Sequence, residues 1–324
     1  MTASAARPVT ILGIFAADLS FRAARLPRMG ETLIASDFAV GAGGKGSNQA
    51  VACARSGGQA AMLTRIGRDV FGELASRTWQ QAGVATDGVE TSDNEATGAA
   101  FIFVDQASGQ NAILVDPGAA RTLDLAFVER ARKRIAGSRV FATQLEQPVD
   151  AALHGLQIAR EARVTTVLNP APAPALVLPD AIWSLCDVVV PNEVEASMLT
   201  GVDVDGPQRA IEAAGIMLAK GVSNVIVTLG SQGVLLRTPT LCLHLPPVVA
   251  GPVYDTTGAG DAFTGGLCTA LAEGCTLADA AHFANAVAGI SVTRLGTAAS
   301  MPDRGEIDRL MKRAGRQRRT MAHP

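Results

Sequence analysis

The chain is poor in aromatic residues and carries little excess charge. Only 4% of its 324 residues are aromatic, and the formal net charge is −2. A charge this small provides no field that would attract nucleic acid or an anionic membrane surface. No apolar run reaches the ~20 residues that a membrane-spanning helix needs, and the N-terminus lacks a charged region followed by an apolar one. These absences predict a cytoplasmic protein without nucleic-acid or membrane partners.

Patterns typical of disulfides and clustered metal sites are also missing. The five cysteines form no CxxC pair, and they indicate small core residues in a reducing compartment. The four histidines are scattered, which argues against a metal cluster. The chain instead has 48% hydrophobic residues, enough for a large core, and no Pro/Ser-rich linker or charge block divides it. We therefore predict a single α/β domain over residues 1–324.

The most informative segment is the glycine-rich turn Asp-Thr-Thr-Gly-Ala-Gly-Asp at 255–261, which leads into an apolar stretch of helical period. Such a turn directs backbone N–H groups and the positive end of a helix dipole at an anion. We predict that Gly258, Ala259 and Gly260 form an anion hole and that Asp261 is a fixed carboxylate beside it. This arrangement suits phosphoryl transfer. The alternative is a tight turn in which Asp255 or Asp261 only caps the helix.

A second glycine-rich segment, Gly-Ala-Gly-Gly-Lys-Gly at 41–46, has two possible meanings. Its glycines satisfy the GxGxxG spacing of dinucleotide-binding folds, but a strand at 9–14 and an extended segment precede it, and that fingerprint should close the first strand. Lys45 is followed by Gly46, so the hydroxyl that a P-loop supplies to magnesium is missing. On this motif alone, an NAD-dependent oxidoreductase with Asp69 on the ribose stays an alternative.

Strand-like and helix-like segments alternate along the chain. Strands are predicted at 9–14, 60–66, 139–145, 164–168, 187–190 and 224–229. Helices are predicted at 48–56, 71–81, 149–162, 208–220, 262–273 and 277–292. This alternation predicts a central, mostly parallel sheet flanked by helices. Two strand-like segments, 31–40 and 99–115, lack intervening helices and form either a small separate sheet or edge hairpins of the main sheet.

Taken together, the motifs resemble those of the ribokinase (PfkB-type) family of sugar kinases. The chain carries Gly-Gly-Lys-Gly-Ser-Asn-Gln-Ala at 43–50 and the 255–263 segment as N- and C-terminal signatures. Between them lie Gln-Leu-Glu, Leu-Asn-Pro-Ala-Pro-Ala, Pro-Asn-Glu-Val-Glu and Thr-Leu-Gly-Ser-Gln-Gly, at 144–146, 168–173, 191–195 and 228–233. The resemblance implies a ribokinase-like fold with a small β-sheet lid inserted at about 15–42 and 96–118. In the family this lid closes over the sugar and often mediates a homodimer.

The resemblance also implies an activity, closest to the ribokinase branch. ATP would donate its γ-phosphate to a primary hydroxyl of a pentose, most simply ribose to ribose 5-phosphate, while Asp261 accepts the hydroxyl proton. The implied sugar contacts are Asp18, Gly43, Gly44, Lys45, Asn48, Glu146 and Asp261. A kinase for another sugar or a nucleoside is an alternative, and so is a silent sugar-binding module, although the intact anion-hole segment argues against the latter.

Cofactor positions follow from the same resemblance. The implied nucleotide contacts are Asn192, Thr228, Gly230, Ser231, Gly233, Gly260 and Asn285. Glu195 would hold Mg²⁺ largely through water, which suits an ion that retains several waters. The implied K⁺ ligands are the side chains of Asp255 and Ser300 and the backbone carbonyls of Thr257, Ser291, Arg294 and Gly296.

Two departures from the family pattern concern the sugar. Ala16 stands where ribokinases typically carry a sugar-binding asparagine, and the lid segment 116–120 ends in Ala120 where many have asparagine. An asparagine-to-alanine change removes a donor and an acceptor, worth roughly 0.5–1.5 kcal/mol. A different pentose, a deoxy sugar or a related polyol therefore stays open as the substrate.

Overall fold

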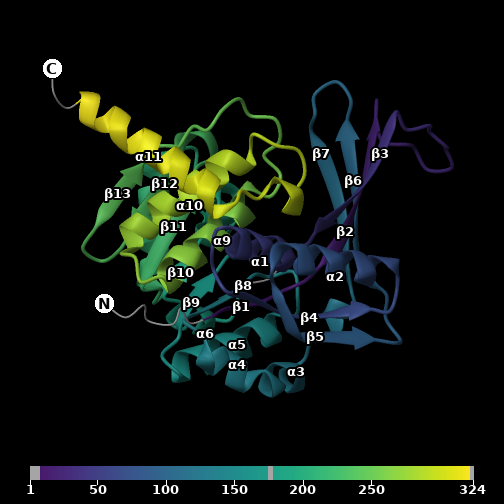
Figure 1. Ribbon diagram of the computed structural model, residues 1–324, viewed down its shortest axis with the longest axis horizontal. Helices are drawn as coiled ribbons and strands as arrows, with labels where there is room; N and C mark the ends of the chain where they lie inside the picture. The colour runs from purple at the N-terminus through teal and green to yellow at the C-terminus, as the bar shows by residue number, and fades with distance from the viewer. Residues whose placement is uncertain (1–7, 174–177, 322–324) are drawn as a thin grey trace.

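The protein is built on two separate sheets, as the computed structural model shows for residues 8–173 and 178–321 (Figure 1). The main sheet has nine strands in the order β13-β12-β11-β10-β9-β8-β1-β4-β5. A second sheet of four strands, in the order β3-β2-β6-β7, projects beside it and is called the lid sheet below. The prediction of a separate small sheet, rather than edge hairpins, is confirmed.

The centre of the main sheet is parallel. The predicted strands are β1 (Val9–Leu12), β4 (Ala60–Gly67), β8 (Val140–Thr143), β9 (Thr165–Leu168), β10 (Val188–Val189) and β11 (Asn224–Thr228). Three strands that the sequence analysis did not predict are the edge strands β5 (Ala85–Ser92) and β13 (Cys242–Leu245) and the strand β12 (Val234–Arg237) next to β13. The last two pair antiparallel, so the sheet is mostly parallel, as expected.

The lid sheet differs in detail from its prediction. It consists of β2 (Ala16–Ala23), β3 (Asp37–Gly43), β6 (Thr97–Asp105) and β7 (Asn111–Gly118). The prediction of a strand over 31–40 is wrong for its first half, because 31–36 form a mostly exposed connection outside the sheet. The predicted strand at 99–115 is two antiparallel strands joined by a turn, and β2 joins the two hairpins through a parallel pairing with β6.

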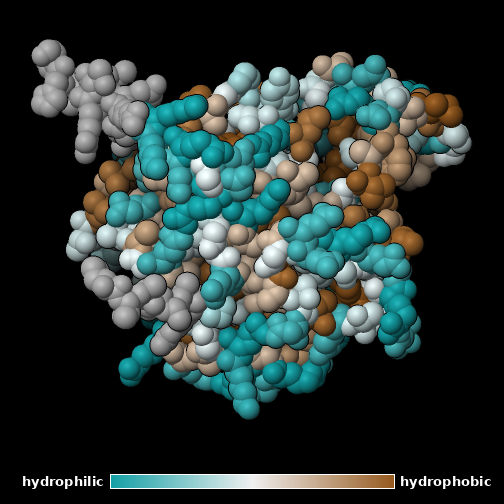
Figure 2. Space-filling view, viewed as in Figure 1, coloured by the Kyte–Doolittle hydropathy of each residue, from teal (hydrophilic) through white to brown (hydrophobic). Residues whose placement is uncertain are grey.

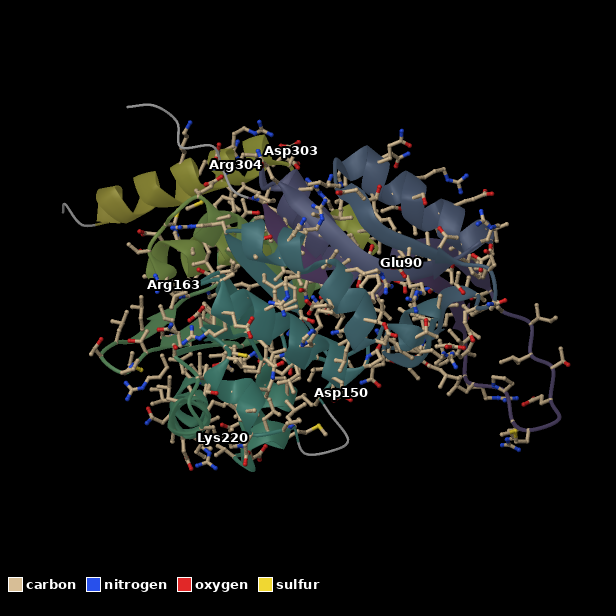
Figure 3. All side chains as sticks on the ribbon, turned by 90° about the horizontal axis from the view of Figure 1, so that it is seen from below. Glu90, Asp150, Arg163, Lys220, Asp303 and Arg304 are labelled. Atoms are coloured by element: carbon tan, nitrogen blue, oxygen red, sulfur yellow. The ribbon has the colours of Figure 1, made fainter. Side chains whose placement is uncertain are left out.

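Helices cover both faces of the main sheet (Figure 1). The predicted ones are α1 (Lys45–Arg55), α2 (Val70–Ala82), α5 (Val149–Glu161), α8 (Pro207–Ala219), α9 (Ala259–Ala272) and α10 (Leu277–Ser291). Further helices are α3 (Leu125–Arg130), α4 (Arg132–Gly137), α6 (Ala181–Ser184), α7 (Glu193–Thr200) and α11 (Arg304–Met321). Charged side chains such as Asp150 and Lys220 lie on their outer surfaces (Figure 3).

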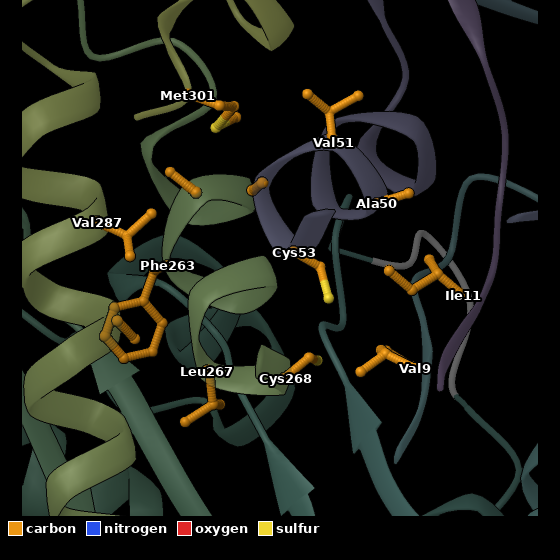
Figure 4. Close-up of a cluster of buried hydrophobic side chains, with 14 of the residues drawn as sticks. Val9, Ile11, Ala50, Val51, Cys53, Phe263, Leu267, Cys268, Val287 and Met301 are labelled. Atoms are coloured by element: carbon orange, nitrogen blue, oxygen red, sulfur yellow. The ribbon is translucent and has the colours of Figure 1, made fainter. Parts of the chain in front are cut away.

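Two hydrophobic cores stabilise this layered arrangement, one on each face of the sheet. In the first, α1 and α9 pack closely over the central strands. Cys53 of α1 points toward Cys268 of α9, and Phe263 of α9 lies beside Val287 of α10, all almost fully buried (Figure 4). The close approach depends on Gly265, where an added Cβ would lie 2.5 Å from Ala52 Cβ. This packing brings the N-terminal ends of α1 and α9 together.

Candidate active site

A cavity of about 200 Å³ lies where α1 and α9 begin, at the carboxyl ends of the parallel strands. Ligands of open α/β sheets commonly bind at this edge. Eight of the residues named in the sequence analysis line the cavity: Lys45, Asn192, Glu195, Thr228, Gly258, Ala259, Gly260 and Asp261. Residues more than 200 positions apart in the chain thus meet at one site.

The glycine-rich turn at 255–261 forms the start of α9 itself. The helix begins at Ala259, three residues before its predicted start, and Gly258 is its N-cap, with φ 77° and no side-chain cap hydrogen bond. Ala259 N–H donates to Thr256 O at 3.2 Å, so this member of the predicted anion hole is partly engaged. A Cβ at Gly260 would have no neighbour within 4 Å, so open space lies beside the helix end. Such an end favours an anion.

Asp261 lies in the first turn of α9 and is only 6% exposed. Its Oδ2 accepts a hydrogen bond from Asn48 Nδ2 at 3.0 Å, and its Oδ1 accepts one from Gln49 Nε2 at 3.1 Å. Burial raises the pKa of Asp261, against the opposing effects of the Lys45 charge and these two amide donors. Asn48 Oδ1 is buried and has no hydrogen-bond partner among the described residues, so it offers an acceptor to a ligand hydroxyl.

Lys45 is a single cation among carboxyl groups. Its backbone N–H donates to Glu146 Oε2 at 2.7 Å. Burial lowers the pKa of the Lys45 ammonium, but the charges of Asp261, Glu146 and Glu195 outweigh burial and raise it overall. Burial raises the pKa of Glu146 to about 7, although Lys45 favours its ionised form. The site thus holds more carboxyl groups than the one ammonium group can neutralise.

Asp18 reaches the site from β2 of the lid sheet. Burial raises its pKa to about 6, against a hydrogen bond from Thr297. A Cβ at Gly43 would lie 2.2 Å from Asp18 Oδ1, so glycine is required there for packing. Gly44 is required as well, because its φ is 83° and a Cβ would lie 2.7 Å from Ile14 O.

Thr297 is a residue that the sequence analysis missed. Its hydroxyl lies 2.6 Å from Ala42 O and 3.4 Å from Asp18 Oδ2, so it links the segment after α10 to the lid sheet. The only sequence signal was its position beside Gly296. Nothing in the local pattern indicates a contact with a residue 279 positions away.

Asn192 and Glu195 form a capping box at the start of α7. Asn192 Oδ1 accepts the Glu195 N–H at 2.8 Å, and Glu195 Oε2 accepts the Asn192 N–H at 2.9 Å. Glu195 is 6% exposed, and burial raises its pKa. The Asn192 acceptor and one Glu195 oxygen thus bind backbone N–H groups, and the second oxygen of Glu195 takes no part in the capping box.

Two other residues of the predicted nucleotide set, Asn285 and Gly233, contact the segment 245–247. Asn285 Nδ2 donates to Pro246 O at 2.8 Å. A Cβ at Gly233 would lie 2.1 Å from Leu245 O, so this glycine is required by packing. Gly230 and Ser231 form the short helical turn after β11. These four residues do not line the cavity described above.

Among the predicted monovalent-cation residues, Asp255 is hydrogen-bonded to Thr257 and Gly296. Its Oδ1 accepts the Thr257 N–H at 2.9 Å and its Oδ2 accepts the Gly296 N–H at 3.0 Å. Ser300 Oγ donates to Thr297 O at 2.8 Å in the same segment. The Arg294 guanidinium is paired with Glu306, and Ser291 Oγ donates to Ala288 O. The structure therefore joins the 255–257 and 294–300 segments that this prediction requires.

The structure contradicts the oxidoreductase alternative. The 41–46 segment is the end of β3 in the lid sheet and the start of α1, and it does not follow a parallel strand of the main sheet. Asp69 is the N-cap of α2, and its carboxylate accepts N–H groups of Phe71, Gly72 and Thr97. The glycine-rich segment and Asp69 therefore have structural roles in the lid sheet and in the cap of α2, and neither forms a dinucleotide site.

Comparisons with known proteins agree with this geometry. A family model described as pfkB family carbohydrate kinase matches residues 7–304. The chain belongs to this family. By this membership the chain is an ATP-dependent carbohydrate kinase, which argues against the silent-module alternative.

Individual pfkB relatives match over nearly their whole length. A ribokinase of Haemophilus influenzae is 38% identical over 308 residues, which cover 95% of this chain and 99% of the relative. A deoxyribokinase of Salmonella typhimurium is 35% identical over 294 residues, which cover 91% of this chain and 95% of the relative. The structure of Arabidopsis thaliana ribokinase complexed with ribose and ATP has a TM-score of 0.90 at 30% identity. The match covers 95% of this chain and 99% of the Arabidopsis chain. Within the described residues, no helix of this pfkB protein is both long and apolar enough to cross a membrane.

Proposed function

We propose that this carbohydrate kinase transfers the γ-phosphate of ATP to the primary hydroxyl of ribose, giving ribose 5-phosphate. The observation that carries the proposal is the position of Asp261, a buried carboxylate in the first turn of α9 beside the open helix end at 258–260. The names of several relatives and the ribose and ATP complex of a similar structure support ribose as the acceptor.

The proposed mechanism needs few groups. Asp261 accepts the proton of the sugar hydroxyl as that oxygen attacks the γ-phosphate. The N–H groups at Gly258, Ala259 and Gly260, with the helix dipole, stabilise the negative charge of the transferring group. Burial raises the pKa of Asp261, so Asp261 is a stronger base than an exposed aspartate.

The sugar contacts proposed are polar groups around Lys45. Asp18 and Glu146 would accept hydrogen bonds from hydroxyls, and Asn48 would do so through its unpaired Oδ1. Gly43 and Gly44 let the backbone approach the sugar. Hydroxyl donors would satisfy the crowded carboxyl groups, which is the physical reason why the pocket suits a polyhydroxy ligand.

Cofactor binding is proposed on the other side of the cavity. ATP would contact Asn192, Thr228, Gly230, Ser231, Gly233, Gly260 and Asn285. Mg²⁺, held by Glu195 through water, would neutralise phosphate charge. K⁺ would bind through Asp255 and Ser300 with carbonyls of Thr257, Ser291, Arg294 and Gly296. The hydrogen bonds that join Asp255 to Thr257 and Gly296 support this grouping.

A deoxypentose is the second candidate substrate. Ala16 lies on β2 two residues before Asp18, on the same face of the strand, and is 2% exposed. Its methyl group cannot form a hydrogen bond, so a sugar that lacks the hydroxyl facing Ala16 loses no hydrogen bond to this side chain. Relatives named deoxyribokinase at 35% identity support this candidate.

We also propose that residues 1–324 act as one domain and form a homodimer through the lid sheet, whose strands lie within the predicted insertions 15–42 and 96–118. Hydrophobic residues gather over the lid sheet at the upper right of Figure 2. The exposed ones include Phe38, Val40, Phe101, Ile113 and Leu114. Such a patch is typical of a protein interface. A Leu114→Lys variant is expected to be monomeric in light scattering.

An ADP-release assay tests the proposed function. Ribose, deoxyribose, other pentoses, hexoses and nucleosides are compared at equal ATP concentration. We expect the highest kcat/KM for ribose. A preference for another sugar by more than about 100-fold, roughly 2.7 kcal/mol in transition-state binding, would overturn ribose but not the kinase.

The proposed base is tested separately. We expect Asp261→Asn to lower kcat by roughly 10²–10⁴ while sugar binding, measured by calorimetry, persists. A variant with near-normal kcat would refute the role of Asp261. Binding that disappears together with activity would instead indicate a structural role.

A further inference from the structure

Gln49 is fully buried on α1, next to Asn48, and its amide is bonded at both ends. Gln49 Nε2 donates to Asp261 Oδ1 at 3.1 Å and to Asn169 Oδ1 at 3.0 Å. Gln49 Oε1 accepts a hydrogen bond from Gln144 Nε2 at 2.6 Å. Unlike Asn48, Gln49 has no unpaired side-chain atom that could contact a sugar.

The orientation of this amide is fixed by its neighbours. Asn169 Nδ2 donates to Val190 O at 2.8 Å, so Asn169 must present its oxygen to Gln49. An ionised Asp261 can only accept. A reversed Gln49 amide would place its oxygen against two acceptors, so the amide has one allowed orientation.

The network extends to the sheet through Gln144. This residue directly follows β8, and Asn169 directly follows β9, so both supports stand on strand ends. Gln144 Oε1 is buried without a hydrogen-bond partner among the described residues, which costs free energy of folding. The amide keeps this orientation because it places Nε2 against Gln49 Oε1. Gly13 provides the necessary space, because a Cβ there would lie 2.2 Å from Gln144 Oε1.

We propose that Gln49 is a positioning residue for phosphoryl transfer: it holds the Asp261 carboxylate in its reactive orientation, and Gln144 and Asn169 in turn hold Gln49. The proposal rests on the proposed role of Asp261 as the base. The two oxygens of Asp261 then have different tasks. Asn48 binds one from the ligand side, and Gln49 binds the other from the protein interior.

Gln49 also contributes to the ionisation of Asp261. The other charged groups that influence Asp261 or are influenced by it are Lys45 of α1, Asp18 of the lid sheet, Glu146 after β8 and Glu195 of α7. A donated hydrogen bond favours the ionised carboxylate. Without Gln49, therefore, Asp261 should ionise at higher pH while its other neighbours stay the same.

The main test is Gln49→Leu in the full chain, measured as kcat against pH with saturating ATP and ribose. We expect kcat to fall roughly 10- to 100-fold, because a small misplacement of a reacting group is costly. The acidic limb of the profile should move to higher pH, and KM for ATP should stay unchanged. A fall in kcat without movement of the limb would overturn the proposal.

A matched control separates positioning from stability. Thr10→Val removes a buried hydrogen bond to Ser138 (2.6 Å) at β1, away from the cavity. It should lower the Tm without moving the acidic limb. If Thr10→Val shifts the limb as Gln49→Leu does, the shift reports lost stability and the proposal fails.

Gln144→Met provides a second route if Gln49→Leu does not fold. It removes the support of Gln49 but no contact to Asp261, so the limb should move in the same direction by a smaller amount. In the double variant Gln49→Leu/Gln144→Met, the Gln144→Met change should add no further shift of the limb, because both changes act through Gln49. Additive shifts would overturn the network.

Asp261→Asn distinguishes the two proposals. If this variant keeps its kcat, the proposed base is wrong. If it is inactive while Gln49→Leu and Gln144→Met keep the wild-type limb, the base stands and only the positioning role fails.

Discussion

The proposed sugar site has three buried carboxyl groups and one ammonium group, that of Lys45, whereas in the proposed nucleotide site polar side chains are bonded to the protein's own backbone. Burial raises the pKa of Asp18, Glu146 and Asp261. Asn192 and Asn285, in contrast, bond backbone N–H or C=O groups. The carboxyl groups of the sugar site therefore lack enough hydrogen-bond donors until sugar hydroxyls bind. The named polar side chains of the nucleotide site already have hydrogen-bond partners in the protein without a ligand.

This difference predicts opposite effects of substitution on stability. Removing charge from the sugar site should stabilise the folded protein and damage function, because unpaired buried charge is costly. Removing a polar group from the nucleotide site should destabilise the protein, because a backbone group loses its partner.

The largest expected effect in this comparison is that of Asp18→Ala. Loss of a charged acceptor costs about 1.5–3 kcal/mol, so kcat/KM for the sugar should fall roughly 10- to 150-fold. Steady-state kinetics measure the loss, and ATP affinity without sugar serves as the control. Equal losses for both substrates would show that Asp18 supports the whole site and would break the comparison.

Glu146→Gln tests the excess charge directly. The folded pKa of Glu146 is about 7 and its ordinary value is 4.5, so between these pH values the folded state binds more protons and stability falls as pH rises. The variant should therefore be more stable than wild type at pH 8, by roughly 1–3 kcal/mol, and equal to it below pH 4.5. Urea unfolding at pH 4, 6 and 8 measures this. A destabilised variant at pH 8 would mean that the carboxylate mainly anchors the Lys45 backbone.

Asn192→Ala is expected to have the opposite sign. It removes the N-cap of α7, which costs about 0.5–2 kcal/mol of stability. Thermal unfolding measures the loss, and Asn192→Ser, which retains a cap acceptor, should recover most of it. If Asn192→Ala leaves the Tm unchanged but raises KM for ATP, the side chain serves the ligand rather than the helix.

The smallest expected effect is that of Ala16→Asn. If ribose is the substrate, a new neutral hydrogen bond of about 0.5–1.5 kcal/mol should raise kcat/KM for ribose roughly 2- to 12-fold. Ala16→Leu, which adds volume without an amide, is the control. A loss on ribose together with a larger loss on deoxyribose would favour the deoxypentose candidate.

Much of the fold could be predicted because its signals are local. Six of the main-sheet strands and six helices follow from period and length, and Gly44 and Gly258 adopt the positive φ that their turns require. The strands β12 and β13 were not predicted; β13, at the sheet edge, is mostly exposed and its four residues carry little periodic signal. The true start of α9 was missed because glycines favour helices weakly, although here they begin one.

The sequence by itself determined which chemical groups are available: a glycine-rich helix start, an aspartate beside it and a lysine after two glycines. Only the tertiary structure decided how those groups are charged and held. Thr297 reaches Asp18 across 279 positions, and Gln49 reaches Asp261 across 212. Burial and electrostatic interaction depend on distance through space, so the raised pKa values of Asp18, Glu146 and Asp261 arise only once the lid sheet, α1 and α9 have packed together.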